Sequence, residues 1–462
     1  MGTPFLIGPL LLVFLVGLLS ACGAEPAAAP DAYAAYRPAV KPAFQADFDL
    51  LQGAPRYDLT ITMDPSGNFI TGTGQILVTN YTGDSWRTLV FRLYPMLEQY
   101  GTQMTIRSVL LDGQAATFEY LAENTAMRIE LPTALPSGEA LRVQLAWRVE
   151  VPRWSDNPNV YALFGRSQFM TSLPLFYPSL AVYEPGATVG TGKWWLETGS
   201  VRGDAAFNLT SLFVVTATLP ADEVPITSGA LITSTRFTTE NGDAMARHVW
   251  ATGPVREFLL HTSPQFSSAT VEAYGTQVSS YWLPGQEAAG RNALRYAVAA
   301  LRIFSDHYGE YPFTHMHVAP APLSFRGMEY PQVNLVGIEV YTRFQNSMEV
   351  LVAHEVAHQW WYQLVHNDPV NTPWLDEALA EYSVKLYYEG LRGDAVAQQL
   401  QRQRWLTPVT LWLQEHSQAP IDRPVATFAS GTEYETVVYG RGALLYDTMR
   451  TVLGERAFRR YL

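Results

Sequence analysis

Residues 353 to 361 read AHEVAHQWW and place two histidines four positions apart, with a glutamate directly after the first. The apolar residues around the motif have helical period, with no Gly or Pro before Pro369, which predicts a helix. Positions i and i+4 share one helix face, so His354 and His358 can converge on one metal ion. Glu355 projects about 100° away around the helix, where it can contact a metal-bound water.

A second helix carries the residue that completes the metal site. A catalytic zinc needs a third protein ligand and an open fourth position. The segment TPWLDEALAEYSVKLYYE, residues 372–389, has helical period with Pro373 near its start. Its Glu377 follows His358 after eighteen intervening residues. Two histidines and one glutamate suit a single Zn²⁺ best, although such a shell also accepts neighbouring divalent ions.

A capping box from Asn346 to Glu349 is expected to begin the first helix.

Four blocks of the sequence resemble the M1 family of zinc metallopeptidases, the gluzincin aminopeptidases. The HExxH motif followed, after eighteen intervening residues, by a Glu is the signature of that family. HQWWYQLV at 358–365 and WLDEALAEY at 374–382 are similar to the blocks that surround the two halves of the signature. FRGMEYPQ at 325–332 resembles the exopeptidase motif, and VVYGRGALLYDTM at 437–449 resembles the block with the catalytic tyrosine. The blocks fall in the family's order.

The resemblance implies a role for each matching residue. His354, His358 and Glu377 would bind one zinc ion per chain. Glu355 would act as general base and then as general acid during peptide-bond hydrolysis. Tyr439 would donate a hydrogen bond to the oxygen that gains negative charge in the tetrahedral intermediate.

The exopeptidase motif leaves the substrate specificity open. By resemblance, Glu329 would bind the protonated amino terminus of a peptide and make the protein an aminopeptidase. Arg326 stands where the family's first Gly is usual, however, and Tyr330 replaces Asn. The alternatives are therefore a zinc oligopeptidase or hydrolase without strict amino-terminus specificity, or a non-catalytic binding lipoprotein on the same fold.

Hydrophobic periodicity predicts two structural domains. Short β-branched and aromatic runs separated by turn residues fill residues 46–264 and predict a β sandwich. Helix-period segments dominate residues 265–462. With the family resemblance, the expected fold is a multidomain β plus α/β chain, in which an amino-terminal β-sandwich domain precedes a thermolysin-like, mainly helical zinc peptidase domain. Family members usually continue with more helices, so the catalytic domain is expected to be truncated at its carboxy end.

The amino terminus predicts export and a lipid anchor. Residues 1–21 have the apolar core of a signal peptide, although no Lys or Arg precedes it. Leu19 to Cys22 resemble a bacterial lipobox, which makes Cys22, the single cysteine of the chain, the expected lipidation site. Residues 22–45 are rich in Ala and Pro and are expected to form an extended tether. The expected location is the bacterial cell envelope, outside the cytoplasm.

The charge of the chain bears on its partners, and the remaining histidines bear on a possible second metal site. The net charge of −12 and the absence of a Lys/Arg stripe argue against nucleic acid. The family resemblance implies peptide substrates as partners, and the expected lipid anchor at Cys22 implies a membrane. The oligomeric state stays open. His307, His315 and His317 allow a second metal site, but no acidic or Cys partner stands at ligand spacing, and ordinary strand and turn histidines are the favoured interpretation.

Overall fold

The computed structural model describes residues 1–2, 31–154, 163–324, 326–416 and 420–462. Residues 35–462 form one compact unit, and residues 1–34 form a separate one. The expected signal peptide and the lipidation residue Cys22 lie outside the described residues. No helix in the described ranges is both long enough and apolar enough to cross a membrane.

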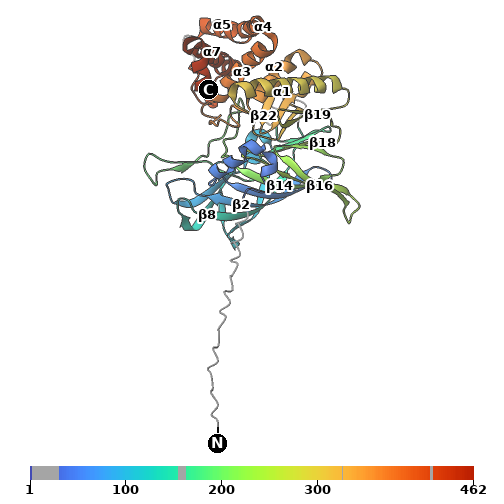
Figure 1. The fold of residues 1–462 in the computed structure, drawn as a ribbon, viewed down its shortest axis with the longest axis vertical. Helices are drawn as coiled ribbons and strands as arrows, with labels where there is room; N and C mark the ends of the chain where they lie inside the picture. Colours follow the sequence, from blue (N-terminus) through green and yellow to red (C-terminus); the bar gives the residue numbers. More distant parts are fainter. Residues whose placement is uncertain (3–30, 155–162, 325, 417–419) are drawn as a thin grey trace. The chain divides into compact units, whose positions relative to one another are not determined.

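An eight-stranded sheet dominates the amino-terminal half of the compact unit (Figure 1). Its central strands alternate between buried and more exposed positions, as expected for a sheet with one face against a core. Strands β1 and β14 pair in parallel, and the other neighbours are antiparallel. The strands, in spatial order, are β16 (Ala230–Thr238), β17 (Ala244–Ala251), β14 (Leu212–Pro220), β1 (Arg56–Met63), β2 (Phe69–Thr79), β8 (Ala140–Glu150), β4 (Met104–Leu111) and β5 (Gln114–Ala115).

The glycines of the GTG sequence at 72–74 have a packing role inside this sheet. They lie within β2, and a Cβ added at Gly72 would overlap the indole of Trp147 on the neighbouring strand β8. The Trp147 side chain is buried and donates a hydrogen bond from Nε1 to the carbonyl oxygen of Phe176 at 3.0 Å. Gly72 therefore makes room for a large core side chain.

Smaller sheets complete the amino-terminal half. One has the order β15 (Val224–Thr227), β18 (Leu259–Ser263), β10 (Thr171–Pro174) and β9 (Gly165–Arg166). Another has the order β11 (Ser179–Leu180), β3 (Trp86–Arg92), β7 (Ala126–Leu135) and β6 (Phe118–Leu121), and β12 (Tyr183–Glu184) pairs with β13 (Lys193–Trp194). Strand β10 is buried along its whole length, so the core extends through this layer.

The expected tether is too long at its carboxy end. Two short 3-10 helices span Arg37–Ala39 and Pro42–Leu50 and belong to the compact unit. Val40 forms a β-bridge with Phe313, and the buried Lys41 donates to the carbonyl oxygen of Tyr274 at 2.6 Å. These apolar and hydrogen-bonded contacts hold residues from about 36 onward against the carboxy-terminal half, which an Ala- and Pro-rich composition alone does not predict.

The carboxy-terminal half joins a five-stranded sheet to a set of helices (Figure 1). The sheet has the order β19 (Ser267–Ala273), β20 (Thr276–Trp282), β21 (His315–Ala321), β23 (Val333–Gly337) and β22 (Gly327–Tyr330), so β22 is an edge strand. The helices are α1 (Glu287–Tyr308), α2 (Met348–Ala357), α3 (Trp374–Arg392), α4 (Asp394–Gln401), α5 (Thr407–Glu415), α6 (Gly431–Tyr434), α7 (Gly442–Leu453) and α8 (Glu455–Tyr461). Two π-helical segments, η7 (Arg402–Leu406) and η9 (Glu435–Arg441), interrupt the helical region.

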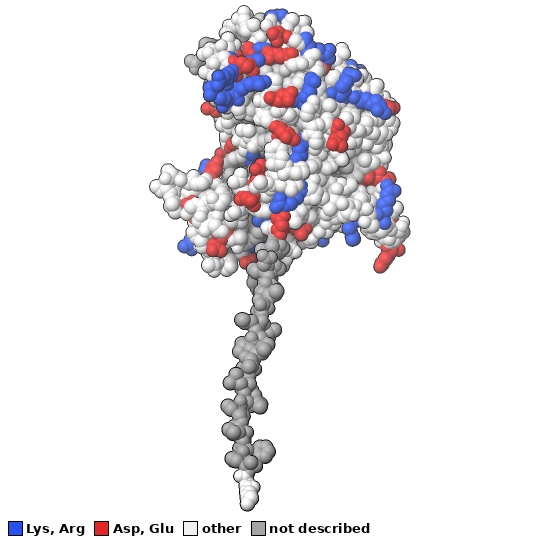
Figure 2. Space-filling view, viewed as in Figure 1, with Lys and Arg blue, Asp and Glu red and all other residues white. Residues whose placement is uncertain are grey.

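This architecture confirms the expected fold class, a strand-rich amino-terminal region followed by a mainly helical domain. Helix α2 packs against α1, α3 and the sheet strands β22 and β23. The predicted boundary near residue 264 falls between β18 and β19, but two more strands follow it and the first long helix, α1, begins only at Glu287. Acidic and basic side chains are interspersed on the face seen in Figure 2.

Candidate metal centre and active site

Helices α2 and α3 position the three expected zinc ligands. His354 and Glu355 lie in the last turns of α2, and His358 follows as its C-cap residue with φ −62° and ψ −18°. This helical backbone keeps His358 on the same face as His354. Glu377 lies in the first turn of α3, directly opposite. All three side chains are buried.

The ligand atoms form an almost equilateral triangle. Nε2 of His354 lies 3.2 Å from Nε2 of His358, and Oε2 of Glu377 lies 3.3 Å from each of them. Ligand atoms about 2.0–2.1 Å from a tetrahedral zinc are separated by about 3.3–3.4 Å. The donor set and its spacing therefore fit zinc, with the fourth position left for water or substrate.

Polar contacts behind the histidines set which nitrogen faces the metal position. Nδ1 of His358 lies 3.2 Å from the carbonyl oxygen of Trp361, which can accept its proton. Nδ1 of His354 lies 3.4 Å from Oε2 of Glu381, a fully buried carboxylate one turn after Glu377 on α3. Each contact leaves Nε2 as the metal-binding atom. Glu381 is in turn held by Arg404, whose Nε donates to Oε1 at 2.7 Å.

The buried carboxylates make the site attractive to a cation. Burial lowers the pKa of His354, but hydrogen bonds to Glu377 and Glu381 outweigh it and raise this pKa to about 9. Burial also lowers the pKa of His358. The negative charges of Glu329 and Glu377 outweigh burial and raise this pKa well above its ordinary value. The surroundings therefore favour positive charge at the point where the ligands converge.

Glu355 is poised to exchange protons. Burial raises the pKa of its carboxyl to about 8, against the opposing effect of His354. Its Oε2 has no hydrogen-bond partner among the described residues. The carboxylate packs against Gly327 of β22, where an added Cβ would overlap it. A carboxyl with a pKa near neutrality is suited to accept a proton and then return it.

Tyr439 approaches the site from the π-helix η9. Its hydroxyl donates a hydrogen bond to Oε1 of Glu377, and its ring stacks on His354 with centroids 5.7 Å apart. The phenol therefore lies beside the metal position, where it can donate to an oxygen bound there. Single π-helical turns are frequent at functional sites because they reposition a side chain on an otherwise regular helix.

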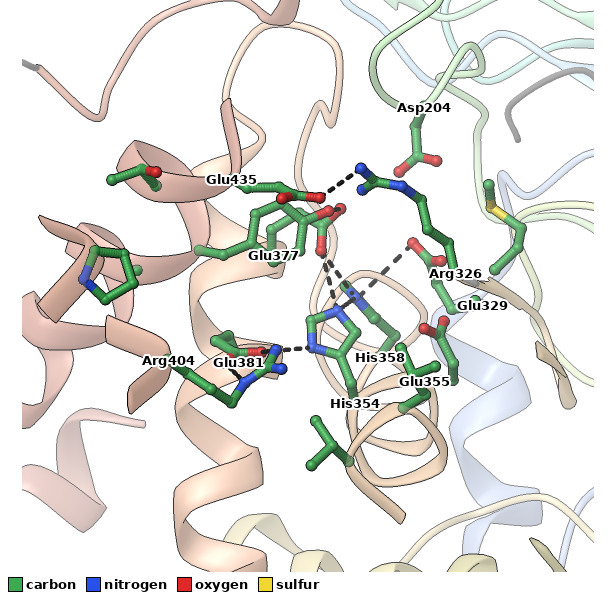
Figure 3. Close-up of a pocket in the computed structure, with 18 of the residues that line it drawn as sticks. Asp204, Arg326, Glu329, His354, Glu355, His358, Glu377, Glu381, Arg404 and Glu435 are labelled. Carbon is green, nitrogen blue, oxygen red and sulfur yellow. Dashed lines mark hydrogen bonds and ion pairs between the residues drawn. The ribbon is translucent and has the colours of Figure 1, made fainter. Parts of the chain in front are cut away.

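Glu329 and the expected catalytic groups line one cavity of about 390 Å³ (Figure 3). Glu329 lies on the edge strand β22, is buried, and has Oε1 3.9 Å from Nδ1 of His358. Burial raises the pKa of its carboxyl, so a cationic partner would be favoured there. Arg326 also lines the cavity and forms an ion pair with Glu435. The predicted residues His354, Glu355, His358, Glu377, Glu329 and Tyr439 are thus brought together.

Sequence patterns missed two residues of the site. Glu381 could have been found, because it lies four residues after Glu377 and so on the same face of α3. Asp204 lines the cavity from the amino-terminal half, between β13 and β14. Nothing in its local sequence marks it, because its place depends on how the two halves of the chain pack.

The structure also bears on the start of α2 and on other possible metal sites. The predicted capping box is wrong: Ser347 is the N-cap residue of α2, and Glu349 instead accepts hydrogen bonds from Tyr387 and Arg392. Glu349 thereby ties α2 to α3. In the described ranges, two groups of side chains have metal-binding geometry, the triad of His354 and a second group of Glu329, His358 and Asp376. Neither group includes His307, His315 or His317.

The site defines a class, the zinc metallopeptidases with two helix-borne histidines and a glutamate from the next helix. Comparison with known proteins points the same way. Residues 292–462 match the model of the Peptidase family M1 domain.

Curated relatives and solved structures agree with that assignment. Aminopeptidase M1-A of Oryza sativa subsp. japonica is 24% identical over 342 residues, 71% of this chain and 36% of that protein. Endoplasmic reticulum aminopeptidase 2 of Homo sapiens is 26% identical over 220 residues, 44% of this chain and 22% of that protein. The chain thus spans about a third or less of these relatives.

Among solved structures, an M1 zinc metallopeptidase mutant from Deinococcus radiodurans, bound to a Tyr-Ser-Ala substrate, aligns with a TM-score of 0.62. The identity is 20%, over 88% of this chain and 85% of that chain. At this identity the likeness shows that the two chains share their fold.

Proposed function

We propose that this protein is a zinc metallopeptidase that releases residues from the free amino ends of peptides. One observation carries the proposal: the zinc-ligand triangle, Glu355, Tyr439 and the buried Glu329 face the same cavity. The M1 domain at 292–462 and the aminopeptidase names of its curated relatives support it. The cofactor is one zinc ion per chain, held by His354, His358 and Glu377.

Each residue has a part in the reaction. Zinc, when bound, polarises the scissile carbonyl and lowers the pKa of a bound water. Glu355 takes a proton from the attacking water and returns it to the leaving amine. Tyr439 donates its phenolic proton as a hydrogen bond to the carbonyl oxygen as negative charge develops there. Glu329 pairs with the substrate's ammonium group and fixes the cut one residue from the amino end.

The catalytic part is tested by the Glu355→Gln variant of the full chain. Glutamine keeps the size of the side chain but cannot accept the proton, so kcat should fall by roughly 10² to 10⁴-fold. The zinc content, measured by atomic absorption, should stay near one per chain because Glu355 is not a ligand. Undiminished hydrolysis by this variant would refute the mechanism.

The amino-terminal specificity is tested with a peptide and its Nα-acetylated twin. An uncharged amide would leave the buried Glu329 without a cationic partner, so kcat/KM should be at least about a hundredfold lower for the acetylated peptide. Glu329→Gln should remove most of this preference. Equal rates on both peptides would favour the alternative, a zinc oligopeptidase without strict amino-terminus specificity.

The location is a separate proposal. The signal-peptide pattern and the lipobox-like residues before Cys22 support export and lipid anchoring in a bacterial cell envelope. In a bacterial host, labelled palmitate should enter the wild-type chain and should not enter Cys22→Ala. Labelling of both chains would show that Cys22 is not the lipid-bearing residue.

A further inference from the structure

The edge strand β22 and the residue before it place Glu329, Gly327 and Arg326 in a line along the chain. Glu329, which receives the ammonium group in the proposed function, lies near its end, and Gly327, at its start, packs against the general base Glu355. Arg326 comes one residue further in the same direction. A peptide with its amino group at Glu329 and its scissile bond near Glu355 therefore extends toward Arg326 on the leaving-group side.

Arg326 brings positive charge into a cavity that is otherwise acidic. The lining includes six carboxylates, from Asp204, Glu329, Glu355, Glu377, Glu381 and Glu435, and two guanidinium groups, from Arg326 and Arg404. Arg404 is committed to the metal-site carboxylate Glu381 through two hydrogen bonds of 2.7 and 3.0 Å. Arg326 instead reaches over Glu329 toward Glu435, as Figure 3 shows.

The pair between Arg326 and Glu435 is suited to exchange. The Arg326 side chain is 40% exposed and that of Glu435 is 50% exposed. Ion pairs with this exposure contribute little free energy, so an incoming carboxylate can share or replace Glu435 at small cost. A guanidinium binds carboxylates in a fork geometry, which also orients the bound group.

We propose that Arg326 binds a carboxylate of the substrate on the leaving-group side of the scissile bond, and so directs the enzyme toward short or acidic peptides. This inference rests on the proposed function for the direction of the peptide. Glu329 and Arg326 are three positions apart, and three positions of extended chain span about 10 Å. The long side chain of Arg326 can reach back over part of this distance toward the bound peptide. The free carboxylate of a dipeptide and the side-chain carboxylate of an acidic second residue both come within reach.

A purely structural role for Arg326 makes a different prediction. Glu435 is the first residue of η9, the segment that carries Tyr439, so the ion pair also links β22 to the catalytic tyrosine. If this link were its only role, loss of Arg326 would slow all substrates by the same factor. Carboxylate binding instead changes the ratio between substrates with and without the carboxylate.

The test compares matched peptides on the full, zinc-loaded chain. Ala-Ala is compared with Ala-Ala amide, and Ala-Asp amide with Ala-Asn amide, for the wild type, Arg326→Gln and Glu435→Gln. The wild type should prefer the carboxylate member of at least one pair by about tenfold in kcat/KM. Arg326→Gln should bring that ratio close to one, and Glu435→Gln should raise it, because it removes the competing carboxylate. The pair that responds identifies the source of the carboxylate.

Two further measurements separate the possible failures. Arg343→Gln changes an exposed arginine that does not line the cavity and should keep the wild-type ratio. Calorimetric binding of the same peptides to Glu355→Gln, with and without Arg326→Gln, gives the ratio of dissociation constants without turnover. If the wild type hydrolyses none of the peptides, but Arg326→Gln still changes the ratio of dissociation constants, the proposed function is refuted and the carboxylate site stands. The same ratio with and without Arg326, or an equal loss on every peptide, would overturn the carboxylate site.

Discussion

Gly327 determines how closely the edge strand approaches the general base. No side chain separates β22 from Glu355, and a Cβ at this position would overlap the carboxylate. The usual family motif has its first glycine one position earlier, where this chain has Arg326. At the residue scale, the close contact between strand and base therefore depends on Gly327, and the preceding position is free to carry a long charged side chain.

Gly327→Ala should displace Glu355 and lower kcat by about a hundredfold, since small displacements of a catalytic group cost this much. Zinc content should not change, because Gly327 is not one of the three expected ligands. Gly431→Ala is the matched control, since an added Cβ there meets no heavy atom within 4 Å and should leave kcat unchanged. Wild-type kcat in Gly327→Ala would show that the base tolerates displacement.

At the scale of elements, helix α3 supplies both a metal ligand and the carboxylate that orients another ligand. Glu377 and Glu381 lie one turn apart, and Glu381 faces Nδ1 of His354 at 3.4 Å. Arg404 and Trp405 of η7 hold Glu381 in place through hydrogen bonds of 2.7 Å to its Oε1. The π-helical segments thus contribute to the site from both sides, η7 through Glu381 and η9 through Tyr439.

Glu381→Gln should weaken zinc binding by about 10- to 100-fold, because the neutral amide makes His354 a less basic ligand. Competition with a chelator of known affinity measures this change. Glu389 lies on the same helix, about two turns further along, and Glu389→Gln instead removes one of the two carboxylates that pair with Arg450. That control should leave zinc affinity unchanged. Equal zinc affinity in Glu381→Gln and the wild type would contradict the orienting role.

At the scale of the whole molecule, the two halves of the chain meet around acidic side chains. Asp204 and Glu257 come from the strand-rich half and line a small cavity next to Glu329 and Tyr362. Oε2 of Glu257 has no hydrogen-bond partner among the described residues, and burial, followed by the charge of Glu329, raises its pKa to about 8. Glu257 is therefore held in its neutral form at neutral pH, which costs stability when the proton is removed.

Stability should fall as the pH rises through this window. Glu257 has an ordinary pKa of 4.5 in the unfolded chain and about 8 in the folded protein, so the folded state binds more protons between these values. Glu257→Gln cannot ionise, so above pH 8 its free energy of unfolding should exceed that of the wild type by an amount on the order of a few kcal/mol. The exposed Glu272→Gln should follow the wild type. Parallel pH curves for Glu257→Gln and the wild type would argue against a buried neutral Glu257.

The sequence by itself determined the chemistry of the metal site and the order of the two halves. The spacing of His354 and His358 fixes their common helix face, and Glu377 follows on a second helix that its own pattern predicts. Period-two and period-3.6 patterns depend only on local backbone geometry, so they are readable without a fold. The wrong capping box and the overlong tether show the limit of this local information, since Glu349 and Lys41 bond to distant residues.

Only the tertiary structure decided which distant groups surround the metal position. Asp204, Glu257 and Arg326 gain their roles from contacts across the packed halves and across the cavity, over long separations in the sequence. The packing of the two halves against each other also fixes burial, and burial raises the pKa of Glu355 and Glu257. Spacing along the chain carries no information about burial, because removal from water depends on everything that packs around a group.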